Sequence, residues 1–341
     1  MKPSISAMIK QFTTFSASVL FACSANAVEP VPITACVFSM MGEAGPEYQG
    51  FLDYQAAAMN WGTKITLKNY INETVAAEEF KSGVCDIAIL SSLQARKFNK
   101  FTATVDAASA VPTYDHLKMV LEMLAKPSAE KYMRVGDYEI IGIMPVGAIY
   151  MFTNDRKAQS IADMAGKRMA MLDNMPELRQ MVVDFGMTPV SSTLTNMYQK
   201  FNNGAIDITA GPGMAYEIME LHKGMEPNGG IVQFPVLQGN MQFVARWNKL
   251  PDGYAQKSRE YFISHFDQTI DRIKQIENKI PSKWWIPLPA NRMNEYEVST
   301  RKVRFTLRDK GFYDPAMLTI LRKVRCKVTP SLAECTSPDA E

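Results

Sequence analysis

The sequence has 341 residues, enough for two domains of ordinary size, each with its own hydrophobic core. Hydrophobic residues make up 47% of the chain and charged residues 21%, a composition typical of a soluble globular protein. Residues 1–27 hold two of the 37 basic residues and no acidic ones, so 35 residues of each sign remain without them, a balance that argues against a nucleic-acid-binding protein.

The N-terminus has the layout of a secretory signal peptide. Lys2 and Lys10 supply positive charge, residues 12–22 form an apolar run, and residues 25–27 form a small-x-small cleavage site. The apolar run is shorter than the roughly 20 residues of a membrane span. We therefore expect a protein exported to the periplasm without a transmembrane helix; a lipid anchor on Cys23 and a buried N-terminal helix are the alternatives.

After this segment, the hydrophobic pattern alternates between strands and helices. We predict strands at residues 33–39, 64–71, 86–90, 140–145, 167–172, 187–192, 207–210, 231–236 and 241–246. We predict helices at residues 48–61, 73–80, 117–124, 160–166, 176–185, 194–201, 254–279, 291–309 and 315–325. Such alternation indicates an α/β fold with a mainly parallel sheet.

One eight-residue pattern occurs twice, 121 residues apart, at residues 80–87 (FKSGVCDI) and 201–208 (FNNGAIDI). In each copy we expect a helix to end at a glycine, Gly83 or Gly204, in the left-handed conformation that glycine adopts without strain. A strand is expected to begin after the aspartate that follows. Two units of the same β-α-β design predict two similar lobes with a cleft between them.

Four cysteines follow the predicted signal peptide, an even number that suits disulfides in an oxidising compartment. Cys36 lies in the first predicted strand and Cys85 opens the strand of the first repeat, so neighbouring strands would bring them together. Cys326 and Cys335 would close a small loop near the C-terminus. Three pairings are possible, and Cys36–Cys85 with Cys326–Cys335 is the one we expect. Zinc is not expected, because the chain has three His and no Cys-x-x-Cys pair.

The sequence contains none of the common catalytic signatures. A Gly-x-Ser-x-Gly elbow, a phosphate-binding loop and a paired-His metal motif are all missing from it. The Gly211-Pro212-Gly213 segment does not fit a dinucleotide fingerprint, because Pro212 and the spacing after it are wrong. Asn72 precedes Glu73 and Thr74 and is interpreted as a helix cap rather than a glycosylation site. We expect no enzymatic activity, no metal and no cofactor.

The predicted strand ends carry a set of candidate ligand contacts. In open α/β sheets, ligands bind beyond the carboxyl ends of the strands. The candidates are Ser39, Met40, Ser91, Ser92, the segment 147–150 with Tyr150, Asp173, Asn174, Gly211, Pro212, Met214, Asn240 and Gln242. For any one of them a turn or capping role is the competing interpretation, and core packing competes for the methionines. As a group they predict a cleft that holds a small molecule.

The second half of the chain resembles the extracytoplasmic solute receptors of TRAP transporters, the DctP-type family. The segments that carry the resemblance cover about 100 residues and lie at 152–154, 161–168, 185–190, 197–207 and 243–251. The chain is more similar still to the Met-rich, AdeT-like solute-binding proteins. The resemblance implies a type II periplasmic-binding-protein-like fold of two α/β lobes around a cleft, followed by C-terminal helices.

On this resemblance we assign residues 28–146 and 232–262 to lobe 1 and residues 147–231 to lobe 2. Residues 263–341 would form helices that pack on both lobes and end in a disordered tail after Cys335. The implied function is capture of a small molecule between the lobes and its delivery to inner-membrane transporter subunits. An exported, efflux-associated adaptor or interaction protein with a vestigial cleft is the alternative.

One departure from the DctP-type pattern concerns the ligand. The resemblance implies an Arg four residues past Gly166 that clamps a substrate carboxylate, but that position is Ala170. Arg168 precedes it on the same strand face and is the candidate substitute, and a second expected Arg is Tyr150. A forked Arg–carboxylate pair is worth roughly 1.5–3 kcal/mol. We therefore expect an uncharged or amphipathic ligand rather than a simple organic acid.

Overall fold

The computed structural model describes residues 29–45, 47–173, 175–337 and 341. The predicted signal peptide and Cys23 lie outside these residues, as does Asn174. Within the described part of the chain, we find no helix that could span a lipid bilayer.

The described residues form one mixed sheet in the order β2-β1-β3-β9-β5-β8-β6-β7, with short β4 and β10 beside the two central strands. The strands are β1 (Val31–Phe38), β2 (Thr63–Tyr70), β3 (Ile87–Ser91), β4 (Arg134–Val135), β5 (Tyr138–Thr153), β6 (Arg168–Leu172), β7 (Thr188–Ser192), β8 (Ile208–Pro212), β9 (Gly230–Arg246) and β10 (Trp285–Ile286). We call β1, β2 and β3 the first half-sheet and β6, β7 and β8 the second half-sheet. Neighbouring strands are parallel within each half-sheet, so the predicted mainly parallel sheet holds for these flanks only.

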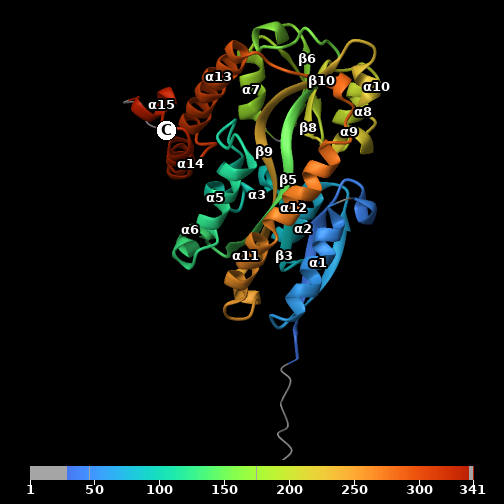
Figure 1. Cartoon of the computed structure of the whole chain (residues 1–341). Coiled ribbons are helices and arrows are strands. Elements are labelled where there is room, and N and C mark those ends of the chain that lie inside the picture. The colour runs from blue at the N-terminus through green and yellow to red at the C-terminus, as the bar shows by residue number, and fades with distance from the viewer. Residues whose placement is uncertain (1–28, 46, 174, 338–340) are drawn as a thin grey trace, which may run out of the picture.

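Helices cover the two faces of this sheet (Figure 1). They are α1 (Tyr48–Met59), α2 (Glu73–Lys81), α3 (Ser92–Ala95), α4 (Lys100–Ala103), α5 (Tyr114–Leu124), α6 (Glu130–Met133), α7 (Pro176–Asp184), α8 (Met197–Asn202), α9 (Ala215–Ile218), α10 (His222–Met225), α11 (Tyr254–Ser264), α12 (Phe266–Glu277), α13 (Ala290–Asp309), α14 (Pro315–Val328) and α15 (Ala333–Thr336). Most of the predicted helices are present, although the one predicted at 254–279 is two helices separated at His265.

The centre of the sheet is a long antiparallel pair, β5 and β9, which runs through both halves of the molecule (Figure 1). The prediction of two short strands in place of β9, and of a strand ending at Pro145 in place of β5, is wrong. In the sequence, Pro145 and nearby glycines interrupt the hydrophobic pattern of a strand, as turn residues do. In the structure, the β5–β9 ladder continues past them through register shifts, one of them between Pro145 and Gly147. Asn240 and Gln242 therefore lie within a strand, not at a strand end.

The repeated pattern has the same structural role in both copies. Gly83 and Gly204 adopt left-handed φ angles of 86° and 74°, which confirms the prediction for the two helix ends. In the first copy, Asp86 donates its N–H to the carbonyl of Thr34 in β1 and accepts the Thr34 N–H on Oδ2 at 3.0 Å. In the second copy, Asp207 makes the same two bonds with Arg168 of β6. Each aspartate thus fastens the start of one strand to the strand beside it.

Both predicted disulfides are present. Cys36–Cys85 joins β1 to the loop before β3, and these two strands are neighbours in the sheet, as the prediction required. Cys326–Cys335 joins α14 to α15.

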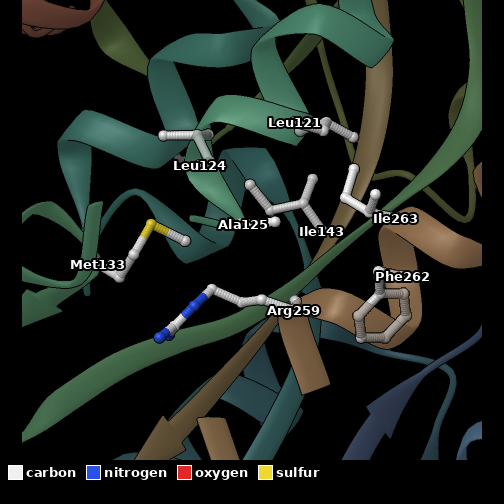
Figure 2. Close-up of a pocket in the computed structure, with 9 residues that line it drawn as sticks. Leu121, Leu124, Ala125, Met133, Ile143, Arg259, Phe262 and Ile263 are labelled. Carbon is white, nitrogen blue, oxygen red and sulfur yellow. The ribbon is translucent and has the colours of Figure 1, made fainter. Parts of the chain in front are cut away.

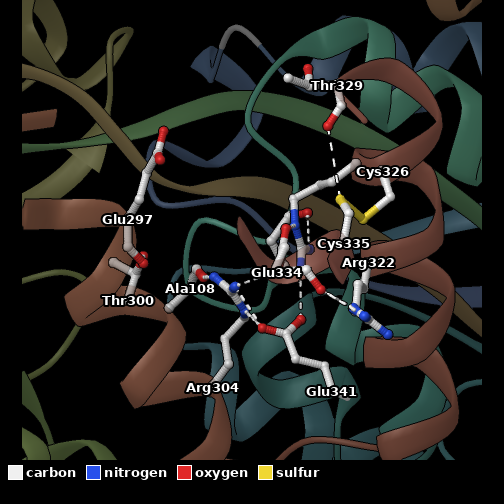
Figure 3. Close-up of polar contacts among 12 residues, drawn as sticks. Ala108, Glu297, Thr300, Arg304, Arg322, Cys326, Thr329, Glu334, Cys335 and Glu341 are labelled. Atoms are coloured by element: carbon white, nitrogen blue, oxygen red, sulfur yellow. Dashed lines mark hydrogen bonds and ion pairs between the residues drawn. A yellow bond between two sulfur atoms is a disulfide. The ribbon is translucent and has the colours of Figure 1, made fainter. Parts of the chain in front are cut away.

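The C-terminal helices are held together by buried charges (Figure 3). Arg325 binds both carboxylate oxygens of Glu334, at 2.5 and 2.8 Å, and one of Glu341 at 2.6 Å. Arg304 of α13 binds the other carboxylate oxygen of Glu341 at 2.7 Å. The predicted disordered tail is therefore wrong for Glu341, whose side chain is buried, because two guanidinium groups compensate its charge.

We predict that Asp207→Ala lowers the free energy of unfolding by about 1–3 kcal/mol at pH 7. Asp207 binds the Arg168 guanidinium at 2.8 and 3.0 Å, although solvent screens the pair because the Arg168 side chain is 44% exposed. The hydrogen bonds from Arg168 hold the pKa of Asp207 well below its usual range. This stabilisation is present above about pH 4 and is lost as the pH falls through the lower, folded-state pKa.

Urea unfolding at pH 7 and at lower pH values measures this effect. Asp184→Ala is the matched control, because Asp184 is exposed and accepts a bond from Gln180 within the same helix. Equal stability of the two variants at pH 7 would contradict the role assigned to Asp207.

A second prediction concerns the buried charge cluster. Arg325→Met leaves Glu334 and Glu341 with uncompensated buried charge and is expected to cost about 3–5 kcal/mol of stability. Burial alone would raise the pKa of Glu334, but Arg325 and Arg304 bring it below its usual value. Lys323→Met, on the exposed side of the same helix, is the control and is expected to leave the urea midpoint within the error of wild type. A similar loss in both variants would show that the helix rather than the ion pair is responsible.

Candidate ligand-binding site

A cavity of about 370 Å³ lies between the two half-sheets and is closed on one side by α13. Ser91 and Ser92 line it from the end of β3, and Gly211 and Pro212 line it from β8. The central strands contribute Ile149 and Met151 from β5, and Val236, Leu237, Gly239, Asn240 and Met241 from β9. Its size falls within the range of pockets that enclose small organic molecules, about 300–1,000 Å³.

The wall of this cavity is mainly apolar. Ten methionines in the described part of the chain line it: Met40, Met151, Met164, Met169, Met171, Met181, Met187, Met197, Met214 and Met241. Met is unbranched and polarisable, so such a wall adapts its shape to what it encloses. Ten of the 23 methionines in the sequence, all in its described part, thus surround one space.

A few polar residues, among them Asn240 and Tyr296, interrupt the apolar wall. Asn240 is 3% exposed; its Nδ2 donates to the Gln238 carbonyl at 2.8 Å, whereas its Oδ1 has no partner among the described residues. The hydroxyl of Tyr296, on α13, is likewise buried without a partner in the described structure, and its ring stacks on Phe234. Buried polar atoms are normally hydrogen-bonded, so these two are candidates for contact with a ligand.

The charged groups on the wall are few. Arg96 is the one basic residue among the described lining residues. It donates to the carbonyls of Ala103 and Phe312 and to the Asp106 carboxylate at 2.9 Å, and its guanidinium lies 4.2 Å from the Phe312 ring centroid. Burial raises the pKa of Asp106 to about 6, against the opposing effect of Arg96. Arg96 is thus committed to the protein and does not present a forked pair of donors.

Ala170 lines the cavity, so the position where the resemblance implies a carboxylate-binding Arg does face the candidate site. Arg168 does not replace it. Its guanidinium binds Asp207 and the Gly204 carbonyl, away from the cavity, because Arg168 begins β6 beside the second repeat. Tyr150 does not line the cavity either: it lies between two lining residues of β5 and packs on Trp285, 5.1 Å between ring centroids.

The predicted contacts therefore fall into groups. Those that line the cavity are Met40, Ser91, Ser92, Gly211, Pro212, Met214 and Asn240. Ser39 instead donates to Glu47, and Gln242 is buried in bonds with Thr102 and Ser92. Asp173 lines a neighbouring groove, described next.

Residues of α13 that line the cavity, Tyr296, Thr300 and Val303, were not predicted as contacts. Their spacing of four and three residues marks a buried helix face in the sequence. It gives no sign of which part of the sheet that face covers.

A smaller, polar groove of about 130 Å³ adjoins the cavity. The two share Phe38, Leu93, Leu172 and Leu194 in their walls. The groove also contains Glu73, at the start of α2, where Asn72 caps the helix as predicted by accepting the N–H groups of the second and third residues. Burial raises the pKa of Glu73 to about 7, although the Ser91 N–H donates to it at 2.5 Å.

A third space, of about 20 Å³, lies between α5, α11 and β5 (Figure 2). Leu121, Leu124 and Phe262 contribute to its wall, and the Arg259 guanidinium binds Glu139 at 2.7 Å. This space is no larger than a water molecule occupies, so we assign it no ligand.

A cavity between two half-sheets that share a long central strand pair is the architecture of solute-binding proteins of the type II periplasmic class. The chain belongs to the family described as Solute-binding protein AdeT 1/2, whose model matches residues 51–340. It is 39% identical over 303 residues to "Probable solute-binding protein AdeT1" of Acinetobacter baumannii, covering 89% of this chain and 100% of that relative. This membership confirms the AdeT-like resemblance.

Solved structures share the fold. A TRAP periplasmic solute-binding protein from Ralstonia eutropha H16, with bound (S)-2-acetolactate, superposes with a TM-score of 0.70 at 13% identity, covering 87% of this chain and 99% of the other. One from Desulfovibrio salexigens, with bound orotic acid, also has a TM-score of 0.70 at 13% identity, covering 88% and 100%. The predicted type II-like α/β fold is therefore confirmed.

We predict a pH-dependent stability that depends on Glu73. The pKa of Glu73 is about 7 in the folded state, above its ordinary 4.5. The contribution of Glu73 to folding stability is therefore fully present below about pH 4.5 and is lost as the pH rises through 7. As the pH rises across this window, wild type should lose on the order of 3 kcal/mol of unfolding free energy relative to Glu73→Gln. Chemical unfolding at several pH values measures it.

Glu78→Gln, in the same helix, is the control. Glu78 is exposed and its pKa is lowered by Lys81, so its titration lies below this window. A flat difference between wild type and Glu73→Gln from pH 4.5 to 8 would rule out the raised pKa.

Proposed function

We propose that this protein is a periplasmic receptor that captures a small molecule between two lobes and delivers it to an inner-membrane transporter. The observation that carries the proposal is the cavity, whose wall is built from both half-sheets and from α13. Residues 28–146 with 232–262, and residues 147–231, are the proposed lobes. A ligand that touches both of them binds the closed arrangement better than the open one, and that difference drives closure.

The central strands are the proposed hinge. β5 and β9 connect the half-sheets, and their ladder has register shifts between Pro145 and Gly147 and between Ile149 and Met151. These positions lie beside the cavity, where the ladder is least regular. Small changes of twist there would move the half-sheets relative to each other without breaking either flank.

Helix α13 belongs to the same proposal. Its Tyr296 packs with apolar residues of the second half-sheet, and its Val303 and Leu307 pack with those of the first. A helix that contacts both sides transmits closure to the outer surface, where a transporter subunit would distinguish the closed from the open form. Residues 263–341 would thus connect both lobes.

We predict that ligand-loaded protein is more compact than ligand-free protein. Native mass spectrometry of protein purified from its own periplasm would reveal a bound small molecule, and small-angle X-ray scattering before and after its removal would show a larger radius of gyration without it. Ala170→Trp fills the cavity and is expected to abolish both retention and compaction. Ala162→Trp makes the same change at an exposed position and is expected to keep both.

Retention of no molecule by the wild type, together with co-purification of a membrane complex, would contradict the receptor function and support an adaptor role. Compaction in Ala170→Trp would contradict the assignment of this cavity.

A further inference from the structure

We infer that the cavity binds an uncharged, mainly apolar molecule that carries a hydrogen-bond donor. This inference rests on the proposed receptor function and names the ligand class of the same site. The methionine-rich wall removes water from whatever it encloses, so apolar surface is favoured there. The two solved structures of this fold described above hold carboxylic acids, so the inferred ligand class differs from theirs.

The charges on the wall exclude an anion. A buried carboxylate needs a cation with free donors. The guanidinium of Arg96 is held by Asp106 and by backbone carbonyls, and of its donor atoms only Nε has no partner among the described residues. Of the two acids on the described wall, Asp106 is already paired with Arg96, and Glu47 adds a carboxylate rather than a cation that could bind an anion. Ala170 adds only a methyl group.

Asn240 indicates the polar group of the ligand. Its Nδ2 is fixed on the Gln238 carbonyl, so its Oδ1 is left as a buried acceptor that only a donor can satisfy. Ser92 donates to the Asn240 carbonyl at 3.3 Å, which holds this part of β9 against the end of β3. Strand pairing and this bond therefore hold the backbone of Asn240 at the cavity wall. The Tyr296 hydroxyl, on α13, provides a second polar contact that can donate or accept.

A fluorescent probe and three matched competitors test the ligand class. N-phenyl-1-naphthylamine is uncharged and apolar and carries one N–H, so its fluorescence should rise and saturate on binding to the full mature chain. Dodecanol, dodecanoate and dodecyltrimethylammonium, used below their micelle concentrations, share one chain length and differ in head group. Dodecanol should displace the probe at concentrations at least about tenfold lower than either charged compound. Dodecanoate loses its hydration and finds no cation with free donors, and the trimethylammonium head has no N–H or O–H to donate to the Asn240 acceptor.

Variants test the assigned contacts. Asn240→Leu should weaken probe and dodecanol binding by about three- to tenfold, because one hydrogen bond is lost. Tyr296→Phe should reduce binding by a smaller factor or leave it unchanged. Asn202→Leu is the matched control: Asn202 also donates Nδ2 to a backbone carbonyl and also has an unpartnered Oδ1 in the described structure, but it does not line the cavity. Ala170→Arg should reverse the preference in favour of dodecanoate.

Displacement by dodecanoate or by dodecyltrimethylammonium at concentrations as low as those of dodecanol would overturn the ligand class and leave the receptor function standing. Equal loss in Asn240→Leu and Asn202→Leu would overturn the role of the Asn240 acceptor. If no probe or competitor binds, and the native protein retains no molecule, the proposed function itself fails.

Discussion

The rest of the structure depends on the pairing of β5 with β9. This antiparallel ladder extends from Tyr138 opposite Arg246 to Thr153 opposite Gly230, so it passes through both halves of the sheet. β3 pairs with one side of it and β8 with the other. Because side chains alternate along a strand, the same ladder directs Ile149 and Met151 into the cavity while Tyr150 packs on the opposite side. The backbone hydrogen bonds between β5 and β9 thus support both halves of the sheet and determine which of their side chains line the cavity.

The cavity combines an adaptable wall with rigid polar positions. Its methionines can change rotamer at small cost, whereas Asn240 is held by bonds to its own strand and to Ser92. The charged groups nearby are neutralised by the protein itself, as Arg96 is by Asp106. With the ligand class proposed above, burial would favour the apolar part of the ligand, and a single donor would determine its orientation. Members of one fold can change ligand class in this way without changing the path of the chain.

The parts of the molecule that local sequence signals determine were predicted well. Gly83 and Gly204 end helices, Asn72 caps one, and the Cys36–Cys85 bridge follows from two adjacent strands. Continuity of β5 was missed, since Pro145 normally argues against a central strand. The role of Arg168 was missed because its partner Asp207 lies 39 residues further along the chain.

The sequence by itself determined most of the elements outside β5 and β9, the two repeated β-α-β units, an expected disulfide pairing and the presence of Ala170 where the family resemblance implies an Arg. These depend on hydrophobic period, on glycine and proline conformations and on residue identity, all of which act locally. Only the tertiary structure decided which residues surround the cavity, that α13 closes it, and that Arg96 and Arg168 are committed to Asp106 and Asp207. The physical reason is that burial and electrostatic compensation depend on neighbours in space, and those neighbours come from distant parts of the chain.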